Sequence, residues 1–400
     1  MALEEAEWKQ LALDWGWPAY RGSQIFTALQ RGQPHDWNAV RQIKPQERER
    51  LAAAMPMRWP EIVRRIESSD GTVRYLLALA DDEQVEAVYL PDEVFDGEGG
   101  KLHRRTTFCI SSQVGCAVNC QFCFTATLGL KRSLSAAEIV AQVQALLAEH
   151  NLAPGGRQGG SDRVNLVFMG QGEPFLNYAN LVRALRVLTS PRGAGLAARR
   201  ITVSTSGIVE KIRCWSSEPF SHGRPRLAIS LNATSDEQRQ RLMPLHLGQG
   251  GMAALFAAID GYAYQPREYL TFEYVLLAGI NDQPDDADRL LHFLAPRRAK
   301  LNLIAWNGGE GLAFHAPEPR RVLAFQAHLV AGGIRTYIRR PRGRDIYAAC
   351  GQLAAAGRTS PDTTVRNSPV AVRTRKNPSS SSPSVTPSQL PPTRTLSPRA

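Results

Sequence analysis

Residues 109–123 read Cys109-Ile-Ser-Ser-Gln-Val-Gly-Cys116-Ala-Val-Asn-Cys120-Gln-Phe-Cys123. The last three cysteines have the spacing C-x3-C-x2-C, which places three thiolates in one short loop. Four cysteines usually hold an iron–sulfur cluster, so three leave one iron open to a non-protein ligand. The alternatives are a zinc site with Cys109 as fourth ligand, or a group of buried thiols. Zinc ribbons usually have two separate C-x2-C pairs, and the absence of a second pair favours the cluster.

Length and composition fit one large domain with additions, or two domains. The chain has 400 residues, 43% of them hydrophobic, which is enough for a large core. Six cysteines are too few for a disulfide scaffold and indicate a reducing compartment. Neither a signal peptide nor a long apolar run is evident, so we expect a cytoplasmic protein without a membrane span. The net charge of +11 favours a polyanionic partner, although charge alone is weak evidence.

Two small units precede the cysteine loop. Residues 1–68 have apolar positions at helical spacing and predict a small helical domain. Arg21 and Gln24 beside its first helix either touch nucleic acid, which would make this an RNA-binding domain, or lie on a solvated helix face. Residues 69–103 predict a β-hairpin connector, with strands at 72–79 and 85–90. Glu86 falls in the middle of the second strand. The pattern alone favours a carboxylate that faces water at a strand edge over one held in a pocket for proton transfer.

Residues 104–356 alternate strands with helices. The predicted strands are 105–111, 164–169, 200–204, 227–231, 269–277, 300–304 and 335–339. Capping boxes at Ser135-x-x-Glu138 and Ser235-x-x-Gln238 predict two helix starts. This order predicts a parallel sheet that closes partly into a (β/α) barrel, with ligands at the carboxyl ends of its strands. Residues 357–400 are basic and rich in Ser and Pro, which predicts a disordered tail.

Polar or glycine-rich clusters follow five of these strands. They are Cys116–Cys123, Gly170–Pro174, Ser204–Gly207, Ser230–Asn232 and Trp306–Asn307. Each by itself is as well explained by a tight turn between strand and helix. Their agreement in position is what predicts a common site.

The motifs resemble those of the bacterial dual-specificity RNA methyltransferase family of radical S-adenosylmethionine (SAM) enzymes, over about residues 18–355. The matching segments are CISSQVGCAVNCQFC (109–123), MGQGEP (169–174), STSG (204–207), FEYVLLAGIND (272–282) and GRDIYAACGQLA (343–354). The last segment is the most specific, because an ordinary radical SAM enzyme needs no cysteine there. The resemblance implies methylation of adenosine C2 in the peptidyl transferase centre of 23S rRNA and in tRNA.

The resemblance also implies a role for each matching residue. Cys116, Cys120 and Cys123 would hold a [4Fe–4S] cluster. A SAM pocket would be lined by Gly172, Glu173, Ser204, Ser230, Leu231, Asn232 and Asn307. Cys350 would carry the methyl group, Cys109 would be its partner thiol, and Glu86 would accept a proton. Cys214 matches no motif and is expected to be an ordinary free cysteine.

Two extra cysteines have a chemical reason in this scheme. An aromatic carbon is a poor nucleophile, whereas a cysteine thiolate is a good one. Cys350 would take a methyl group from a first SAM, and a second SAM would be cleaved reductively to activate that methyl for addition to C2. Glu86 would then remove the C2 proton, and Cys109 would release the product by forming a disulfide with Cys350. An electron donor such as flavodoxin or ferredoxin is implied, and a monomer is the default.

RNA contacts are predicted from clustered cations, because arginines suit phosphates and unstacked bases. The candidates are Arg335, Arg339, Arg340, Arg342, Arg344, Lys131 and Arg132. Phe124, Gln171 and Asn232 depart from the usual family pattern and are expected to change packing or SAM affinity. Two alternatives stay open: a methyltransferase acting on adenosine C8, of the antibiotic-resistance type, and a non-catalytic ribosome-binding protein with a structural cluster.

Overall fold

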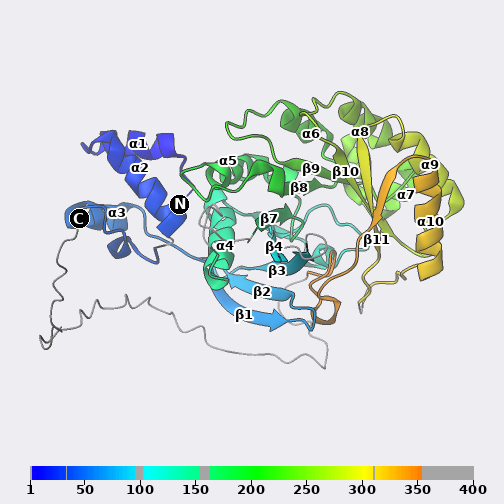
Figure 1. Cartoon of the computed structure of the whole chain (residues 1–400), viewed down its shortest axis with the longest axis horizontal. Coiled ribbons are helices and arrows are strands. Elements are labelled where there is room, and N and C mark those ends of the chain that lie inside the picture. The colour runs from blue at the N-terminus through cyan, green and yellow to red at the C-terminus, as the bar shows by residue number, and fades with distance from the viewer. Residues whose placement is uncertain (1, 33, 96–101, 153–162, 310, 354–400) are drawn as a thin grey trace, which may run out of the picture. The chain divides into compact units, whose positions relative to one another are not determined.

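The structure is a computed structural model of the chain and describes residues 2–32, 34–95, 102–152, 163–309 and 311–353. These residues form a ten-stranded sheet with helices packed against it (Figure 1). All of them belong to one unit, Met1–Asn367, so the predicted domain boundaries at residues 68, 103 and 356 stay predictions. The tail predicted to be disordered, 357–400, lies outside the described residues.

The N-terminal segment is helical at first, as predicted. It contains α1 (Glu5–Asp14), α2 (Ala19–Thr27), a π-helical turn (Ala28–Gly32) and α3 (Pro45–Ala54). Arg21 donates to Gln24 Oε1 at 2.9 Å and to the Gln42 carbonyl, so its guanidinium is used within this segment. The helical prediction is wrong for the end of the segment, because β1 (Glu61–Glu67) pairs antiparallel with β2 and joins the sheet.

The predicted hairpin is confirmed and forms the antiparallel part of the sheet. Strand β2 (Val73–Ala78) and strand β3 (Gln84–Phe95) are joined by a tight turn, in which Leu79 N donates to Glu83 O at 2.8 Å. Strand β3 also pairs antiparallel with β4 (Leu102–Cys109). The order β1-β2-β3-β4 therefore places β3 between two neighbours rather than at an edge.

The rest of the sheet is parallel, and each of the seven predicted strands is confirmed. After β4 come β7 (Arg163–Phe168), β8 (Ile201–Thr205), β9 (Arg226–Ser230), β10 (Leu270–Leu276), β11 (Ala299–Ala305) and β12 (Arg335–Ile338). Neighbouring strands follow chain order, and β1 and β12 are the two ends of the sheet. The sheet does not close on itself among the described residues, which confirms an α/β fold with a partial (β/α) barrel.

The helices of this part are α4 (Ala136–Glu149), α5 (Tyr178–Thr189), α6 (Val209–Ser217), α7 (Asp236–Leu242), α8 (Gly251–Asp260), α9 (Pro284–Leu294) and α10 (Pro319–Ala331). Both predicted helix starts are confirmed, since Ser135 and Ser235 accept hydrogen bonds from Glu138 N and Gln238 N. The full capping box forms only at Ser135, because the Gln238 side chain accepts from Thr234 N instead. A second, two-stranded sheet joins β5 (Gln113–Gly115) to β6 (Leu130–Ser133). No helix of the described ranges has the length and hydrophobicity that crossing a membrane requires.

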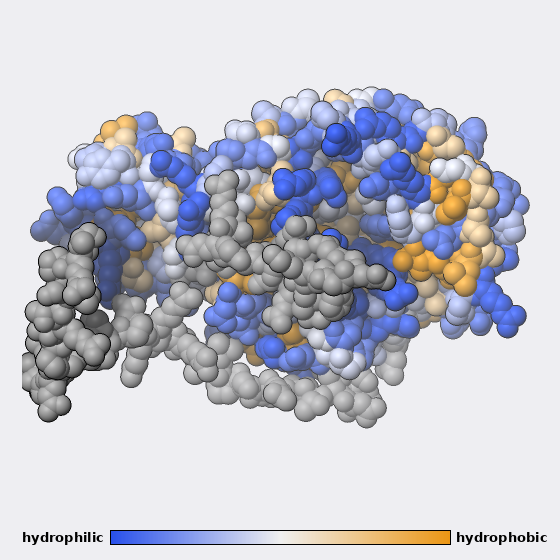
Figure 2. Space-filling view, in the orientation of Figure 1, coloured by the Kyte–Doolittle hydropathy of each residue, from blue (hydrophilic) through white to orange (hydrophobic). Residues whose placement is uncertain are grey.

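Strand alternation separates a buried outer face from an inner face. On β10, Leu270, Phe272 and Tyr274 are fully buried in the main core, whereas Glu273 lines a cavity. Burying a large apolar side chain contributes about 1.5–3 kcal/mol, so the outer face holds the helices to the sheet. The molecular surface seen in Figure 2 is mostly hydrophilic, with a larger hydrophobic area toward α9 and α10.

Candidate active site

The three cysteines of the C-x3-C-x2-C loop line one cavity. The loop begins directly after β5 and ends directly before a 3-10 turn, Phe124–Leu128. Cys116, Cys120 and Cys123 are partly exposed, and all three line a cavity of about 170 Å³. Three thiols that line one hollow are the donor set that an iron–sulfur cluster requires.

Main-chain hydrogen bonds fix this loop. Cys116 N donates to Gly129 O at 2.8 Å, and Gln121 N donates to Leu242 O at 2.9 Å. The indole nitrogen of Trp306 donates to Phe122 O at 2.9 Å. Burial raises the pKa of the Cys116 thiol to about 12. A buried site in which thiolates would repel one another favours a cationic group that neutralises them.

The carboxyl ends of the parallel strands form the rest of the cavity wall. Six of the seven residues predicted for a SAM pocket line it, together with the three loop cysteines: Gly172, Glu173, Ser204, Ser230, Asn232 and Asn307. They lie at the carboxyl ends of β8 and β9 and in the loops after β7, β9 and β11. The partial barrel therefore brings together the motifs that the sequence places far apart, as expected for ligand sites of this architecture.

Gly172 is required by its close approach to β5. Its φ of +98° lies in the left-handed region, and an added Cβ would lie 2.6 Å from Gln113 Cβ. The next residue, Glu173, donates its backbone N–H to Gln113 Oε1 at 2.8 Å. The loop after β7 is thereby fixed against the start of the cysteine loop.

The Glu173 carboxylate links two of these loops. It accepts hydrogen bonds from Phe175 N at 2.9 Å and from Ser206 N at 2.6 Å. Burial raises the pKa of Glu173, and these backbone donors oppose the rise. The residue thus presents a fixed carboxyl group at the cavity wall, where the amino group of an amino-acid ligand would be attracted.

Short polar side chains line the cavity beside it. Ser204 Oγ and Ser230 Oγ lie 3.4 Å apart on neighbouring strands. Asn232 has a left-handed φ of 56°, and its Oδ1 accepts from Val275 N at 2.9 Å. Asn307 Nδ2 donates to Cys350 O at 3.3 Å, which connects this wall to the C-terminal segment.

Leu231 does not line the cavity, unlike its two neighbours. Strand alternation turns its side chain into the main core, where it is fully buried. Its carbonyl accepts a hydrogen bond from Arg239 Nη1 at 2.7 Å. The buried Arg239 also contacts the Ser206 carbonyl, so one guanidinium holds the loops after β8 and β9 together. The sequence did not predict this role, because Arg239 lies on a short polar helix and matches none of the motifs.

The segment 343–353 brings Cys350 to the same cavity. Phe124 N donates to Gly351 O at 2.8 Å, and Thr125 Oγ1 donates to Leu353 O at 2.6 Å. Cys350 lines the cavity with the three loop cysteines. The fourth cysteine singled out by the resemblance therefore opens onto the predicted cluster and SAM site.

Cys109 lies behind Cys350, away from the cavity wall. It ends β4 and packs in a small apolar group with Val88, Ile346 and Ala348. Burial raises the pKa of Cys109 to about 12, and Cys350 adds to the rise. The three loop cysteines pack in a different apolar group, which argues against zinc with Cys109 as fourth ligand. All six cysteines are free thiols in this structure.

Glu86 is buried and paired, so the prediction of a solvent-facing carboxylate is wrong. Its Oε1 accepts from Arg74 Nε at 2.8 Å, and Arg74 Nη1 also donates to Ile346 O at 3.0 Å. The reason is that β3 lies between β2 and β4, which excludes water, while β2 supplies the countercharge. Glu86 lies two residues before Val88, which pairs with Cys109, and it does not itself line the cavity.

Gln171 contacts Glu86, which the sequence did not lead us to expect. Its Nε2 donates to Glu86 Oε2 at 3.4 Å, and its Oε1 accepts from Glu86 N at 3.3 Å. Ser111 Oγ donates to Glu86 O at 2.6 Å and accepts from Gln171 N at 2.9 Å. The departure at position 171 therefore concerns the predicted proton acceptor, and not only packing or SAM affinity.

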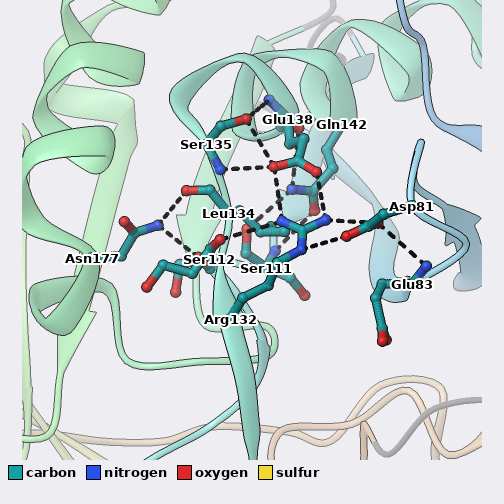
Figure 3. A network of polar contacts seen from close by, with 11 residues as sticks. Asp81, Glu83, Ser111, Ser112, Arg132, Leu134, Ser135, Glu138, Gln142 and Asn177 are labelled. Carbon is teal, nitrogen blue, oxygen red and sulfur yellow. Dashed lines mark hydrogen bonds and ion pairs between the residues drawn. The ribbon is translucent and has the colours of Figure 1, made fainter.

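Some of the cations predicted to contact RNA are paired within the protein. Arg132 bonds Asp81 at 2.7 Å and Glu138 at 2.8 Å, and Figure 3 shows that these contacts join the hairpin turn, β6 and α4. Lys131 pairs with Glu83 at 2.8 Å. Two of the remaining five are also paired: Arg342 with Asp70 at 2.9 Å, and Arg339 more loosely with Glu273 at 3.8 Å. These side chains have structural partners that compete with RNA.

The residues present fit both expected cofactors. Within the described ranges, no group of three or more Cys, His, Asp or Glu side chains could hold a single metal ion. The loop cysteines instead suit a cluster, whose separate irons each take one thiolate. The fixed carboxyl, hydroxyl and amide groups beside them suit a zwitterionic ligand such as SAM.

Comparisons with known proteins agree with this site. A model of the radical SAM superfamily matches residues 110–291. A probable dual-specificity RNA methyltransferase RlmN of Koribacter versatilis is 46% identical over 344 residues, which cover 84% of this chain and 96% of the relative. The RlmN of Nitratidesulfovibrio vulgaris is 41% identical over 347 residues, covering 85% and 89%. The crystal structure of a radical SAM methyltransferase from Sphaerobacter thermophilus matches with a TM-score of 0.77 and 37% identity, covering 88% and 98%.

Proposed function

The chain belongs to the RlmN family of dual-specificity RNA methyltransferases within the radical SAM superfamily, and we propose that it methylates adenosine C2 in 23S rRNA and tRNA. It is a SAM-dependent enzyme with a [4Fe–4S] cluster. One observation carries the proposal beyond family membership: Cys350 opens onto the cavity of the three loop cysteines, with Cys109 packed behind it. A radical SAM enzyme without a methyl carrier needs neither thiol.

Each cofactor has its own set of residues in this proposal. Cys116, Cys120 and Cys123 hold the cluster, and the six cavity-lining polar and glycine residues hold SAM. When bound, the two supply reductive, one-electron cleavage of SAM, which activates a methyl group for carbon–carbon bond formation. The hydrogen-bonded loops supply fixed positions, so that little ordering is left to occur during the reaction.

Cys350 carries the methyl group. Its thiolate attacks the methyl carbon of a first SAM: the new sulfur–carbon bond forms as the bond to the sulfonium breaks, and S-adenosylhomocysteine leaves. Arg339 lines the same cavity and lies close to both Cys350 and Cys109, and its positive charge opposes the rise in the pKa of Cys109 that burial causes. The thiolate is needed because adenine C2 cannot itself displace a methyl group from SAM.

Glu86 and Cys109 complete the reaction. The Glu86 carboxylate accepts the C2 proton, and hydrogen bonds from Arg74 and Gln171 hold its two oxygens in place. Because Glu86 does not line the cavity, this step requires a shift of the surrounding segments when the base enters. Cys109 then attacks the sulfur of Cys350: a disulfide forms as the sulfur–carbon bond breaks, the departing carbon keeps that electron pair and takes up a proton to become the methyl group, and the one electron that was supplied for SAM cleavage is given back.

Two further parts of the proposal concern partners and place. A small one-electron donor such as flavodoxin or ferredoxin would reduce the cluster, and a monomer acting on cytoplasmic RNA is sufficient for the reaction. The names of the relatives favour C2 over the C8 alternative, and the intact pair of Cys109 and Cys350 disfavours a non-catalytic ribosome-binding protein.

The direct test is mass spectrometry of nucleosides from RNA incubated anaerobically with reconstituted protein, SAM and reductant. We expect 2-methyladenosine and two SAM molecules consumed per methylated base. A peak of 8-methyladenosine would place the chain with the C8 enzymes. RNA without methylated adenosine, from protein with a full cluster, would contradict the proposal.

A further inference from the structure

The inner face of the last three parallel strands is polar and partly exposed toward their N-terminal ends. On β11, Leu301 and Leu303 are fully buried toward the helices, whereas Lys300 and Asn302, which alternate with them, are partly exposed. The edge strand β12 shows the same alternation, with Thr336 buried and its neighbours exposed. Alternate residues of a strand lie on opposite faces, so the exposed residues share the inner face.

Strand pairing arranges this face in two layers. One layer is formed by Thr271, Lys300 and Arg335, and the next by Glu273, Asn302 and Tyr337. Closed (β/α) barrels fill such layers with branched apolar side chains. Polar and charged residues here do not serve core packing, and the face is available to a ligand.

Cations cluster around one aromatic ring at the N-terminal end of this face. The Tyr269 ring has Arg335 at 4.6 Å, Lys300 at 5.2 Å and Arg298 at 5.5 Å from its centroid. None of these three cations makes an ion pair with the carboxylates that the structure describes. The Tyr269 ring offsets part of the electrostatic repulsion among the three cations, and a bound polyanion would offset the remaining repulsion.

This cluster is continuous with the catalytic cavity. Arg335 and Tyr337 lie on β12, and Arg339 follows the strand directly and donates its N–H to Leu303 O, so the alternation continues and the three side chains share one face. Arg339 and Glu273 line the cavity, and Tyr337 lies next to them with 52% of its surface exposed. A path of cations and aromatic rings thus runs from the Cys350 site to the N-terminal ends of β10–β12. We call these residues the inner track: Tyr269, Arg298, Lys300, Arg335 and Tyr337.

We propose that the inner track binds the single-stranded RNA next to the target nucleotide, with Lys300 and Arg335 on its phosphates and Tyr337 stacked on a base. This rests on the proposed function and adds where the flanking strand lies. Proteins that hold single strands combine a cationic groove with aromatic platforms, which is the arrangement found here. The track lies inside the curve of the sheet, which suits an extended strand better than a folded acidic protein.

The test compares RNA binding by variants of the full-length, cluster-loaded protein. The double variant Lys300→Gln/Arg335→Gln removes the two phosphate contacts, and Tyr337→Ala removes the platform. Arg320→Gln is the matched control, because Arg320 is an exposed arginine on α10, on the outer side of the sheet. Fluorescein-labelled tRNA is titrated at several salt concentrations and followed by fluorescence anisotropy.

We expect the double variant to bind tRNA about tenfold more weakly near physiological salt, with a salt slope reduced by about 1.4, or about 0.7 per phosphate contact. Tyr337→Ala should weaken binding about tenfold without changing the slope. Iron content and RNA-independent SAM cleavage with dithionite should match wild type in every variant, which shows that the fold and the cavity are intact.

Other outcomes separate the explanations. Unchanged affinity and slope in the double variant would overturn the inner track. Normal RNA binding, with activity lost only when a flavodoxin supplies electrons and kept with dithionite, would also overturn it and assign the face to the electron donor. A wild-type protein that binds tRNA through the track but methylates no adenosine would contradict the proposed function instead.

Discussion

The two ends of the active site are built from different interactions. At the cluster and SAM end, the contacts that hold the loops end on main-chain groups, as in the contacts of Cys116 and Gln121, and this is true even where the side chains of Glu173 and Arg239 take part. At the thiol and acid end, buried side chains hold one another, as in the contact between Arg74 and Glu86. The first end depends on backbone shape, whereas the second depends on charges that are costly to bury unless each has its partner.

The largest effect should come from removing the methyl carrier. Cys350→Ala should lower methylation by at least about a thousandfold, because the residues that remain cannot accept the methyl group. Iron content should stay unchanged, since the cluster end does not use this thiol. Cys214→Ala is the control: Cys214 lies on α6 and is predicted to have no role. Formation of 2-methyladenosine by Cys350→Ala at a rate near that of wild type would contradict the role of Cys350 as methyl carrier.

Breaking the buried ion pair should cost stability as well as activity. Arg74→Gln leaves Glu86 buried without its countercharge and should lower the free energy of unfolding by about 3–5 kcal/mol. Lys131→Gln breaks the exposed pair with Glu83 and should cost about 0–1 kcal/mol. Urea unfolding of both variants measures the difference. Equal losses of unfolding free energy in the two variants would mean that the buried ion pair between Arg74 and Glu86 does not stabilise this end of the active site.

A backbone change should damage the cluster and SAM end. Gly172→Ala strains a left-handed backbone and places a Cβ against Gln113. It should lower the free energy of unfolding by about 1–3 kcal/mol and should also weaken SAM binding. Gly279→Ala adds only the strain, because its φ is +71° and nothing lies within 4 Å of the added Cβ. Equilibrium binding of SAM to the two variants distinguishes the effect of the close contact at Gly172 from the effect of backbone strain alone. Normal SAM binding by Gly172→Ala would contradict the role of the glycine.

The smallest effect concerns the other face of β2–β4. His150 bonds the Tyr75 hydroxyl at 2.8 Å and stacks on Tyr89, and burial lowers its pKa from 6.5 to about 4. The unfolded chain therefore binds this proton more readily. The stabilisation should be complete above pH 6.5 and be lost progressively as the pH falls toward 4. Urea midpoints at pH 7 and pH 5 should differ less in His150→Gln than in wild type, while His222→Gln, at an exposed site, should behave like wild type.

Sequence reasoning worked where the signal is local. The cysteine loop, the seven parallel strands and both Ser caps are written in spacings of a few residues. The surroundings of Glu86 were missed because its partners, Arg74 and Gln171, come from other strands and loops. Strand β1 was missed for the same reason, since its sequence EIVRRIE becomes a strand only by pairing with β2.

The cations show the same limit. Clustering in sequence suggested that Arg132 and Arg342 bind RNA, but tertiary partners pair them with Glu138 and Asp70. Lys300 was not singled out at all, and only the register of β11 against β12 places it beside Arg335. Leu231 was placed in the SAM pocket with its neighbours, although alternation turns it into the core.

The hydrogen bond from Thr125 to Leu353 joins residues 228 positions apart. During synthesis the ribosome releases the cluster loop long before the Cys350 segment, since translation adds about 5–20 residues each second. The cysteines of the loop are therefore exposed in a nascent chain that cannot yet methylate anything. Joining the two ends of the active site is one of the last events in making this enzyme, and newly made protein acquires activity only after most of it has been translated.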